Sequence, residues 1–488
     1  IQRIQSYVDK SIEKMVSLYD YKETIFNDIE SRLCSKNDDS EVCCKLKDIA
    51  LHKWQDEAYE VWKANNYKGI FKVATGCGKT VFALSCLQKV IEEGYNVKVV
   101  IIVPNIALLN QWEKELKDTF HVDARKIGRV GDGKNELRPF TIYINCSAQK
   151  YLKNHLNYGS AVESIGENDS NPYYFVIADE CHNYGSENNL EMLNYFNEIN
   201  QDKDVKVKFF SIGLSATPER TNPMETRQLE KILGNIIYEY DLIRAIDEKI
   251  IATPIINDID IDFTFEEMKD YRKKKKTFDD SKENLKEVID RLHKNYEEEY
   301  LVHLAYDIIQ NKKYKKIIDY VKSKQKEYRE VYKQKTVWVN EFNDWYNENA
   351  DDDMEIAWNA RNLTIAHQAK KDIVYGMEVR MKEFSDNMDA FKEHRVIIFA
   401  ERIADAKTKL YNKLINKYGD KAVAFYNSED KRSVKEEAIN NFKSGIANIL
   451  VSVKALDEGV DVPKADMAFV FQGEQDERQQ IQRLGRII

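Results

Sequence analysis

Residues 74–80 have the composition and order of a phosphate-binding loop. They are Ala-Thr-Gly-Cys-Gly-Lys-Thr, between the apolar run Ile70–Val73 and the helix-like segment Val81–Val90. Glycines let backbone amides close around an anion at the start of a helix, a lysine reaches the β- and γ-phosphates, and a hydroxyl ligates Mg²⁺. We therefore predict a nucleotide site made by Gly76, Cys77, Gly78, Lys79 and Thr80, with Thr80 as a metal ligand. The strict motif has glycine at the position of Val73, so this loop is a variant.

Two adjacent carboxylates, Asp179 and Glu180, follow the apolar run Phe175–Ala178. A strand that ends in Asp-Glu places both carboxylates at the carboxyl edge of its sheet, where α/β sheets bind ligands. Asp179 can hold Mg²⁺ through water, and Glu180 can orient and deprotonate an attacking water. Together with Lys79 they form a candidate catalytic set for nucleotide hydrolysis.

Short apolar runs alternate with amphipathic stretches over residues 45–245 and again from about residue 394. This alternation predicts parallel sheets covered by helices on both faces. The strands predicted in the first region are Ile70–Val73, Val97–Val103, Thr141–Ile144, Tyr174–Ala178 and Lys208–Gly213. Those predicted in the second region are Val396–Phe399, Ala422–Phe425, Ile449–Val451 and Met467–Phe471.

Two other segments lack this alternation and are predicted to be helical. Residues 1–44 are charged and contain no Gly or Pro, and residues 264–393 have long stretches without either. The predicted organisation is an N-terminal helical segment 1–44, a first α/β lobe 45–245, a linker 246–263, a helical insertion 264–393 and a second α/β lobe 394–488. The basic run Arg272–Lys276 in the insertion predicts a solvated helix face, with a phosphate-contacting arm as the alternative.

Composition bounds the class of protein without identifying its chemistry. The 488 residues are 43% hydrophobic and 32% charged, enough apolar material for several cores, and the length predicts about three domains. The net charge of −9 counts mildly against a nucleic-acid partner, although local basic stripes bind phosphates on acidic proteins too. No apolar run predicts a membrane span, and seven cysteines without a Cys-x-x-Cys pair predict free thiols. We therefore expect an intracellular protein that does not bind membranes. Because the first residue is Ile1 and not methionine, the sequence leaves open whether a targeting signal has been removed.

Four motifs in a fixed order give the chain a specific resemblance. They are the loop Gly76–Thr80, Asp179-Glu180-Cys181-His182, Ser215-Ala216-Thr217 and Gln482-Arg483-Leu484-Gly485-Arg486. In this order they resemble the superfamily 2 helicases, in the DExH group with a DECH box. The resemblance covers about 45–245 and 395–488. It implies two RecA-like lobes that bind ATP with Mg²⁺ between them and use hydrolysis to act on a nucleic acid.

The resemblance also implies roles for individual residues. Gln55 matches the glutamine that reads adenine. Ser215 and Thr217 match the motif that couples hydrolysis to strand movement. Gly459 and Asp461 match a segment that touches the ribose and closes the lobes. Arg486 matches an arginine finger, and Gln482 and Arg483 fit the same interface.

A nucleic-acid track is implied by weaker matches. Pro104 and Asn105, after the run Val97–Val103, match a loop that touches the phosphate backbone, and Gln149 matches a later contact of the first lobe. Ser147 and the pair Gly128 and Gly131 match similar contacts less closely. Such loops suit sequence-independent phosphate binding. A threonine of the superfamily that contacts a phosphate is replaced here by Val453.

Whether the track is DNA or RNA stays open at this point. The segments 103–112 and 457–463 look most like the helicases of DNA repair and of restriction or phage defence, which favours DNA by analogy. An RNA helicase of the same architecture is the first alternative. The second is an ATP-gated clamp that recruits an effector without unwinding, with a protein partner bound by the N-terminal segment or the insertion.

The last motif is incomplete by comparison with the superfamily. Relatives carry another arginine three residues after Arg486, whereas this chain stops at Ile488. We therefore expect the chain to be a fragment, or the ordered part, of a longer protein.

Overall fold

The computed structural model describes residues 45–46, 49–158, 165, 173–201, 209–219, 223–292, 300–332, 334–427, 429–453 and 465–472. The predicted N-terminal helical segment lies outside these ranges. So do five predicted site residues: Gly459, Asp461, Gln482, Arg483 and Arg486.

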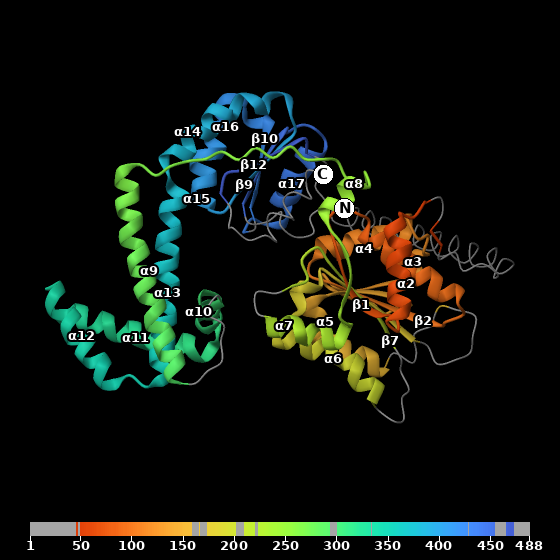
Figure 1. Ribbon diagram of the computed structural model, residues 1–488, viewed down its shortest axis with the longest axis horizontal. Helices are drawn as coiled ribbons and strands as arrows, with labels where there is room; N and C mark the ends of the chain where they lie inside the picture. The colour runs from red at the N-terminus through yellow and green to blue at the C-terminus, as the bar shows by residue number, and fades with distance from the viewer. Residues whose placement is uncertain are drawn as a thin grey trace, which may run out of the picture.

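The first lobe is built on an eight-stranded sheet with the order β4-β3-β5-β2-β6-β7-β1-β8 (Figure 1). Its strands are β1 Lys68–Val73, β2 Val97–Val103, β3 Ile127–Gly131, β4 Lys134–Asn135, β5 Phe140–Ile144, β6 Tyr173–Asp179, β7 Phe209–Ser215 and β8 Ile236–Tyr240. Every neighbouring pair is parallel except β3 with β4. The five predicted strands of this region are confirmed. Strands β3, β4 and β8, which lie at or next to the sheet edges, were not predicted from the sequence.

Helices cover both faces of this sheet, as the apolar runs predicted. The helices on one face are α2 Lys53–Ala64, α3 Lys79–Glu92 and α4 Ile106–Asp118; those on the other are α5 Asn145–Tyr158, α6 Glu187–Gln201 and α7 Pro223–Leu233. Strand β2 shows why its run is uninterrupted. Val99 and Ile101 face the first helix layer, whereas Val100 and Ile102 face the second. Because both faces are buried, apolar side chains occupy every position but one. Two short helices, η2 Ala124–Lys126 and η4 Cys181–Tyr184, complete the sheet region, and α8 Leu242–Asp247 follows β8.

The second lobe has a four-stranded parallel sheet with the order β10-β11-β9-β12. Its strands are β9 Val396–Ala400, β10 Val423–Asn427, β11 Ile449–Val453 and β12 Met467–Val470, which confirms the four predicted runs. Its helices are α14 Glu378–Asn387, η6 Met388–Glu393, α15 Ile403–Asp405, the π-helix η7 Ala406–Tyr411, α16 Asn412–Tyr418, η8 Asp420–Ala422 and α17 Arg432–Lys443.

The core of the second lobe begins earlier in the chain than the predicted boundary at 394. Phe384, Met388 and Phe391 pack in one cluster with Val396 and Ile398 of β9. These three residues were predicted to belong to the insertion. Their burial against the second sheet instead makes them part of the second lobe.

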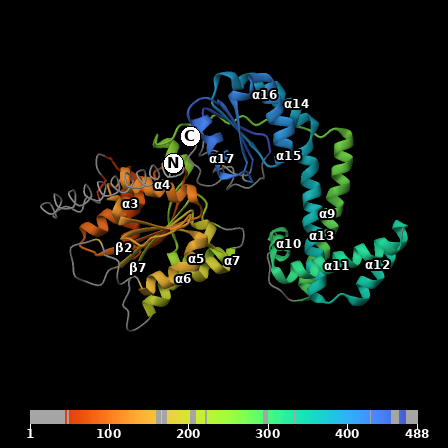
Figure 2. The same cartoon turned by 180° about the vertical axis from the view of Figure 1, so that it is seen from behind.

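The insertion is an arm of helices, shown in green and teal in Figure 2. Its helices are α9 Phe265–Arg291, α10 Leu301–Gln310, α11 Lys312–Val331, α12 Lys335–Asn349 and α13 Asp352–Gly376. Helices α9 and α13 run side by side and carry α10–α12 at the far end. The predicted helical character is confirmed. The basic run lies on an exposed stretch of α9, where Lys275 pairs with Asp279 at 2.9 Å, as expected for a solvated face.

The arm is anchored on the second lobe. Asp372 near the end of α13 pairs with Arg402 at 2.7 Å, and Gln472 Nε2 donates to the carbonyl of Tyr375 at 3.0 Å. Between the lobes, Arg432 at the start of α17 pairs with Asp132 of the β3–β4 turn at 3.2 Å.

Two expectations from composition can be compared with the described residues. None of their helices is long and apolar enough to cross a membrane. Four cysteines, Cys77, Cys86, Cys146 and Cys181, are free thiols, as predicted; the other three lie outside the described ranges.

Candidate functional site

The strand order brings three separate motifs to one edge of the first sheet. Strand β7 lies between β6 and β1, and all three are parallel. Their carboxyl ends therefore lie together, with the loop 74–78 after β1, Asp179 at the end of β6 and Ser215 at the end of β7. This is the edge at which α/β sheets bind ligands.

The loop after β1 has the backbone that phosphate binding requires. Gly76 and Gly78 adopt φ values of +84° and +86°, which residues other than glycine rarely adopt. Lys79 begins α3, and its Nζ lies 3.3 Å from the carbonyl oxygen of Val73, so the ammonium folds back over the loop. Cys77 is buried, and burial raises the pKa of its thiol to about 11. The cysteine is therefore a neutral thiol near pH 7, with only its backbone suited to binding an anion.

Gln55 is part of the support of this loop rather than a surface residue of α2. Its side chain is 1% exposed. Its Nε2 donates to the carbonyl of Gly78 at 3.0 Å, and its Oε1 accepts from the backbone N–H of His52 at 2.9 Å. The amide is thus held against the phosphate-loop backbone by hydrogen bonds at both of its polar atoms.

Asp179 is a buried carboxylate with one hydrogen bond to each oxygen. Its Oδ2 accepts from the indole Nε1 of Trp112 at 2.7 Å, and its Oδ1 accepts from the backbone N–H of Glu180 at 3.0 Å. Burial, reinforced by the adjacent Glu180 carboxylate, raises the pKa of Asp179 above its usual value, while the Trp112 bond and the Lys79 charge oppose this rise. The loop that carries Lys79 and this carboxylate lie at the carboxyl ends of β1 and β6, on the same edge of the sheet. Trp112 was not singled out by the sequence analysis.

Glu180 has a backbone conformation that is uncommon for a residue with a side chain. Its φ of +48° and ψ of +51° lie in the left-handed region. Such conformations cost about 1–3 kcal/mol and are concentrated at functional sites. The turn directs the chain from β6 into η4 and leaves the Glu180 side chain 19% exposed at the sheet edge. A carboxylate there is accessible to water, as a general base must be.

A polar chain connects Glu180 with the motif at the end of β7. His182 Nδ1 lies 3.4 Å from Glu180 Oε2 and 2.9 Å from Ser215 Oγ. Ser215 Oγ also accepts from the backbone N–H of Thr217 at 3.0 Å. All three residues beyond Glu180 are buried. His182 therefore contacts both Glu180 and Ser215, although it was not among the site residues predicted from the sequence.

The donor set at this edge fits Mg²⁺ bound together with a nucleotide. The described residues contain no cluster of three His, Cys, Asp or Glu that could hold a metal alone. Mg²⁺ typically takes only one or two protein oxygens and completes its shell with water and substrate phosphates. Asp179 and the Thr80 hydroxyl, the second residue of α3, are suited to supply those oxygens.

The predicted track residues lie at the same edge but beyond β6. Pro104 and Asn105 follow β2, and Gln149 lies in the first turns of α5, after β5. Asn105 caps α4, because its Oδ1 accepts from the backbone N–H of Leu108 at 3.0 Å. Gln149 is exposed and donates to Asn189 Oδ1, and Asn189 in turn donates to the carbonyl of Asn183 in η4 at 2.9 Å. The structure thus separates a nucleotide half of the edge from a candidate track half.

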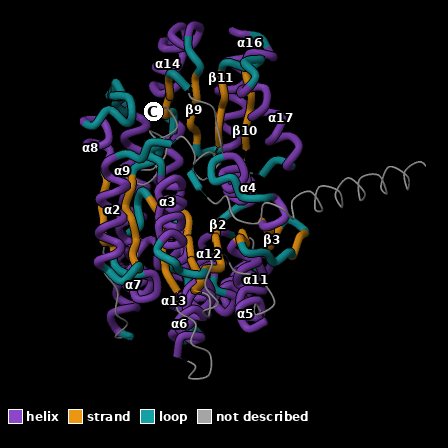
Figure 3. Tube along the Cα trace, turned by 90° about the vertical axis from the view of Figure 1, so that its right-hand side faces the viewer, coloured by secondary structure: helices purple, strands orange, loops and turns teal. Residues whose placement is uncertain are grey.

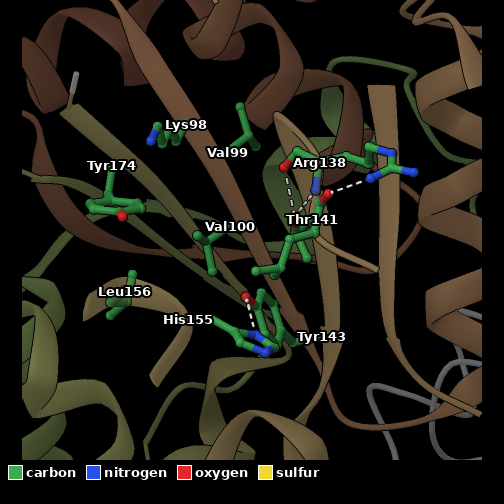
Figure 4. Close-up of a pocket in the computed structure, with 10 residues that line it drawn as sticks. Lys98, Val99, Val100, Arg138, Thr141, Tyr143, His155, Leu156 and Tyr174 are labelled. Carbon is green, nitrogen blue, oxygen red and sulfur yellow. Dashed lines mark hydrogen bonds between the residues drawn. The ribbon is translucent and has the colours of Figure 1, made fainter. Parts of the chain in front are cut away.

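A separate hollow lies toward the amino-terminal ends of β2, β5 and β6, away from these motifs (Figure 4). Lys98, Thr141 and Tyr174 line it, and Tyr143 shares a hydrogen bond with His155 at 3.1 Å. The guanidinium of Arg138 points away from the other labelled side chains in this view. The hollow shares no residue with the candidate site.

Comparison with known proteins gives two family matches. Residues 48–220 match the model of the type III restriction enzyme res subunit, and residues 380–488 match that of the helicase conserved C-terminal domain. The second match begins inside α14, in agreement with the packing of that helix.

Individual relatives extend across most of the chain. The DNA 3'-5' translocase XPB2 of Sulfurisphaera tokodaii is 26% identical over 449 residues, which are 91% of this chain and 80% of the relative. The putative ATP-dependent RNA helicase MJ1505 of Methanocaldococcus jannaschii is 23% identical over 455 residues, 86% of this chain and 54% of the relative. Among solved structures, the Pyrococcus furiosus Hef helicase domain aligns with a TM-score of 0.45 and 18% identity, over 89% of this chain and 92% of that domain.

Proposed function

The chain is an ATP-dependent helicase of superfamily 2, and we propose that it is a translocase that moves along DNA. The observation that carries the proposal is the placement of Lys79, Asp179 and Glu180 at one edge of the sheet, with His182 in contact with both Glu180 and Ser215. A hydrolysis site that is physically connected to a second motif is what a motor needs. The similarity to a protein named as a DNA 3'-5' translocase supports DNA as the track.

Each residue of the nucleotide half has a separate task in this account. The Lys79 ammonium holds the β- and γ-phosphates, and Gln55 supports the loop and reads adenine. Glu180 takes the proton of the water that attacks the γ-phosphorus as the bond to the β–γ bridging oxygen breaks. Asp179 and Thr80 would hold Mg²⁺, which when bound offsets the negative charge of the phosphates.

The second lobe supplies the rest of the site in this proposal. Arg486 stabilises charge that develops on the γ-phosphate, and Gln482 and Arg483 act at the same interface. Gly459 and Asp461 contact the ribose as the lobes close. These five assignments rest on the motifs alone, because the residues lie outside the described ranges.

The track half binds the phosphate backbone in this proposal. Asn105 caps the 13-residue helix α4, and the amino-terminal end of a helix carries partial positive charge that favours phosphate. Pro104 and Gln149 lie in the same half of the edge, whereas Ser215 and Thr217 lie at and just after the end of β7, between the two halves. Contacts of this kind position a strand without selecting its sequence.

We expect DNA of any sequence to stimulate ATP hydrolysis, and the stimulation to weaken steeply with salt. Phosphate contacts release counterions, so the logarithm of DNA affinity should fall with the logarithm of salt concentration at a slope of about −0.9 per neutralised phosphate. Steady-state ATPase measured with random-sequence DNA and RNA of equal length, over a salt series, tests this. Stronger stimulation by RNA would favour an RNA helicase. Hydrolysis without movement would favour an ATP-gated clamp, whose protein partner would then be sought on the N-terminal segment or the insertion.

We expect His182→Ala to keep ATP binding and to weaken the coupling between nucleotide and DNA. The coupling is the ratio of DNA dissociation constants measured without and with a non-hydrolysable ATP analogue, typically about 5–150-fold in coupled systems. In His182→Ala the ratio should fall toward 1, because the connection from Glu180 to Ser215 is lost. Ser215→Ala should give the same loss, and the double variant should add nothing further. A wild-type ratio in His182→Ala would show that the histidine is only a packing residue.

A further inference from the structure

Trp112 presents a polar atom to the nucleotide site from within the core of the first lobe. The side chain is 1% exposed and packs in the cluster that also contains Leu109 and Leu116 of α4. Its indole N–H points to Asp179 Oδ2 at 2.7 Å, while the other carboxylate oxygen accepts the backbone N–H of Glu180. One donor on each oxygen fixes both the position and the plane of the carboxylate. The Glu180 N–H comes from the residue next to Asp179 in the chain, whereas the Trp112 indole comes from a separate element, helix α4.

Helix α4 is held at its start and along its exposed side. Its N-cap Asn105 belongs to the candidate track loop. Arg129 of β3 donates to Glu113 Oε2 and to Asn110 Oδ1, both at 2.8 Å. These contacts tie the position of the helix that carries the indole to the positions of the loop and of β3.

The same helix lies at the edge of the first lobe that faces the second lobe (Figure 3). Arg129 is 3.8 Å from Asp132, and Asp132 pairs with Arg432 of α17 across the lobes. Contacts thus run from α17 through β3 to α4 and end at Asp179. A hydrogen bond of 2.7 Å is lost when its donor moves away by about 1 Å, because a donor and an acceptor about 3.6 Å apart are no longer hydrogen-bonded.

We propose that Trp112 is a positioning residue for ATP hydrolysis. Its indole orients Asp179 toward Mg²⁺, and this orientation therefore depends on the position of helix α4. The inference rests on the proposed role of Asp179 as the carboxylate that holds Mg²⁺. Residues that orient a metal-binding group through a hydrogen bond commonly change metal affinity or activity by about 10–100-fold when they are removed. The indole acts through Asp179 and does not itself touch the substrate.

Trp112→Phe tests the inference, because it keeps an aromatic ring in the core and removes the N–H. Trp62→Phe is a matched control: Trp62 is fully buried in the same cluster and donates its indole N–H to the carbonyl of Ser211 at 2.9 Å, away from Asp179. The readouts are the affinity for a fluorescent ATP analogue with and without Mg²⁺, and the Mg²⁺ concentration at half-maximal ATPase. We expect Trp112→Phe to raise that Mg²⁺ concentration about 10-fold or more and to leave Mg²⁺-free nucleotide affinity within about twofold. Trp62→Phe should change neither.

Two further arms separate the possible failures. Asp179→Asn should raise the Mg²⁺ requirement at least as much as Trp112→Phe; if it does not, the assignment of Asp179 in the proposed function is wrong. Suppose that Asp179→Asn raises the Mg²⁺ requirement. The positioning role of Trp112 is then overturned if Trp112→Phe and Trp62→Phe both keep the wild-type Mg²⁺ requirement, or if both shift it by the same factor. Should Trp112→Phe not fold, benzothienylalanine at position 112 retains the bicyclic shape without the N–H and replaces it in the test.

Nucleic acid supplies the test of the link through α4. Added DNA should lower the Mg²⁺ requirement of the wild-type protein and of Trp62→Phe, because the track loop and Asp179 are joined by one helix. In Trp112→Phe the requirement should no longer respond to DNA. A response of wild-type size in that variant would contradict the link.

Discussion

Replacing Lys79 with alanine abolishes ATP hydrolysis and most of the affinity for ATP. The lysine begins α3 directly after the glycine loop, and its ammonium is the charge that this loop brings to the β- and γ-phosphates. No other group named at the site carries a positive charge on the first-lobe side. Hydrolysis should therefore fall to background at saturating DNA. Equilibrium titration with a fluorescent ATP analogue should show the loss of binding directly.

Lys89→Ala is the matched control for this experiment. Lys89 lies on the same helix and pairs with Asp56 at 2.8 Å, at a distance of nearly three turns from the loop. Removing an exposed ion pair costs little stability, on the order of 0–1 kcal/mol. This variant should keep both ATP affinity and turnover. Wild-type turnover in Lys79→Ala would refute the whole nucleotide-site assignment.

Replacing Glu180 with glutamine slows hydrolysis by about 10²–10⁴ and leaves ATP binding intact. Glutamine has nearly the same shape, so it fits the left-handed turn as glutamate does, but it cannot accept the proton of the attacking water. Single-turnover hydrolysis and a separate ATP titration measure the two effects. With ATP present, the variant should accumulate in the DNA-bound state.

The control here is Glu187→Gln, a change of the same chemistry at the exposed start of α6. It should hydrolyse ATP at the wild-type rate. If Glu180→Gln loses ATP binding in the direct titration, then Glu180 is a structural residue of the turn, and the base lies elsewhere.

The local parts of the site could be predicted because each is encoded in a continuous segment. The loop 74–80 and the pair Asp179–Glu180 each follow an apolar run, and both are found at strand ends in the structure. The contacts that organise the site join distant segments. Trp112 and Asp179 are 67 residues apart, and His182 and Ser215 are 33 apart. No periodicity in the sequence indicates which strands become neighbours, so these partners could not be read from it.

The boundary of the second lobe shows the same limitation in another form. Phe384, Met388 and Phe391 have the spacing of a buried helix face, which the helices of the insertion also have. Spacing predicts that a face is buried but does not identify the core that buries it. Only the packing against Val396 and Ile398 assigns these residues to the second sheet.

Displacement of a third strand from a DNA triplex is the most direct test of the central claim that hydrolysis at this site drives movement along DNA. The assay detects translocation without requiring strand separation. We expect the wild-type protein to release the third strand with ATP but not with the non-hydrolysable analogue. The Glu180→Gln variant should not release it with either nucleotide. The wild-type rate should fall with salt together with DNA-stimulated hydrolysis. Release by Glu180→Gln at the wild-type rate, or vigorous DNA-stimulated hydrolysis with no release by the wild-type protein, would contradict the account.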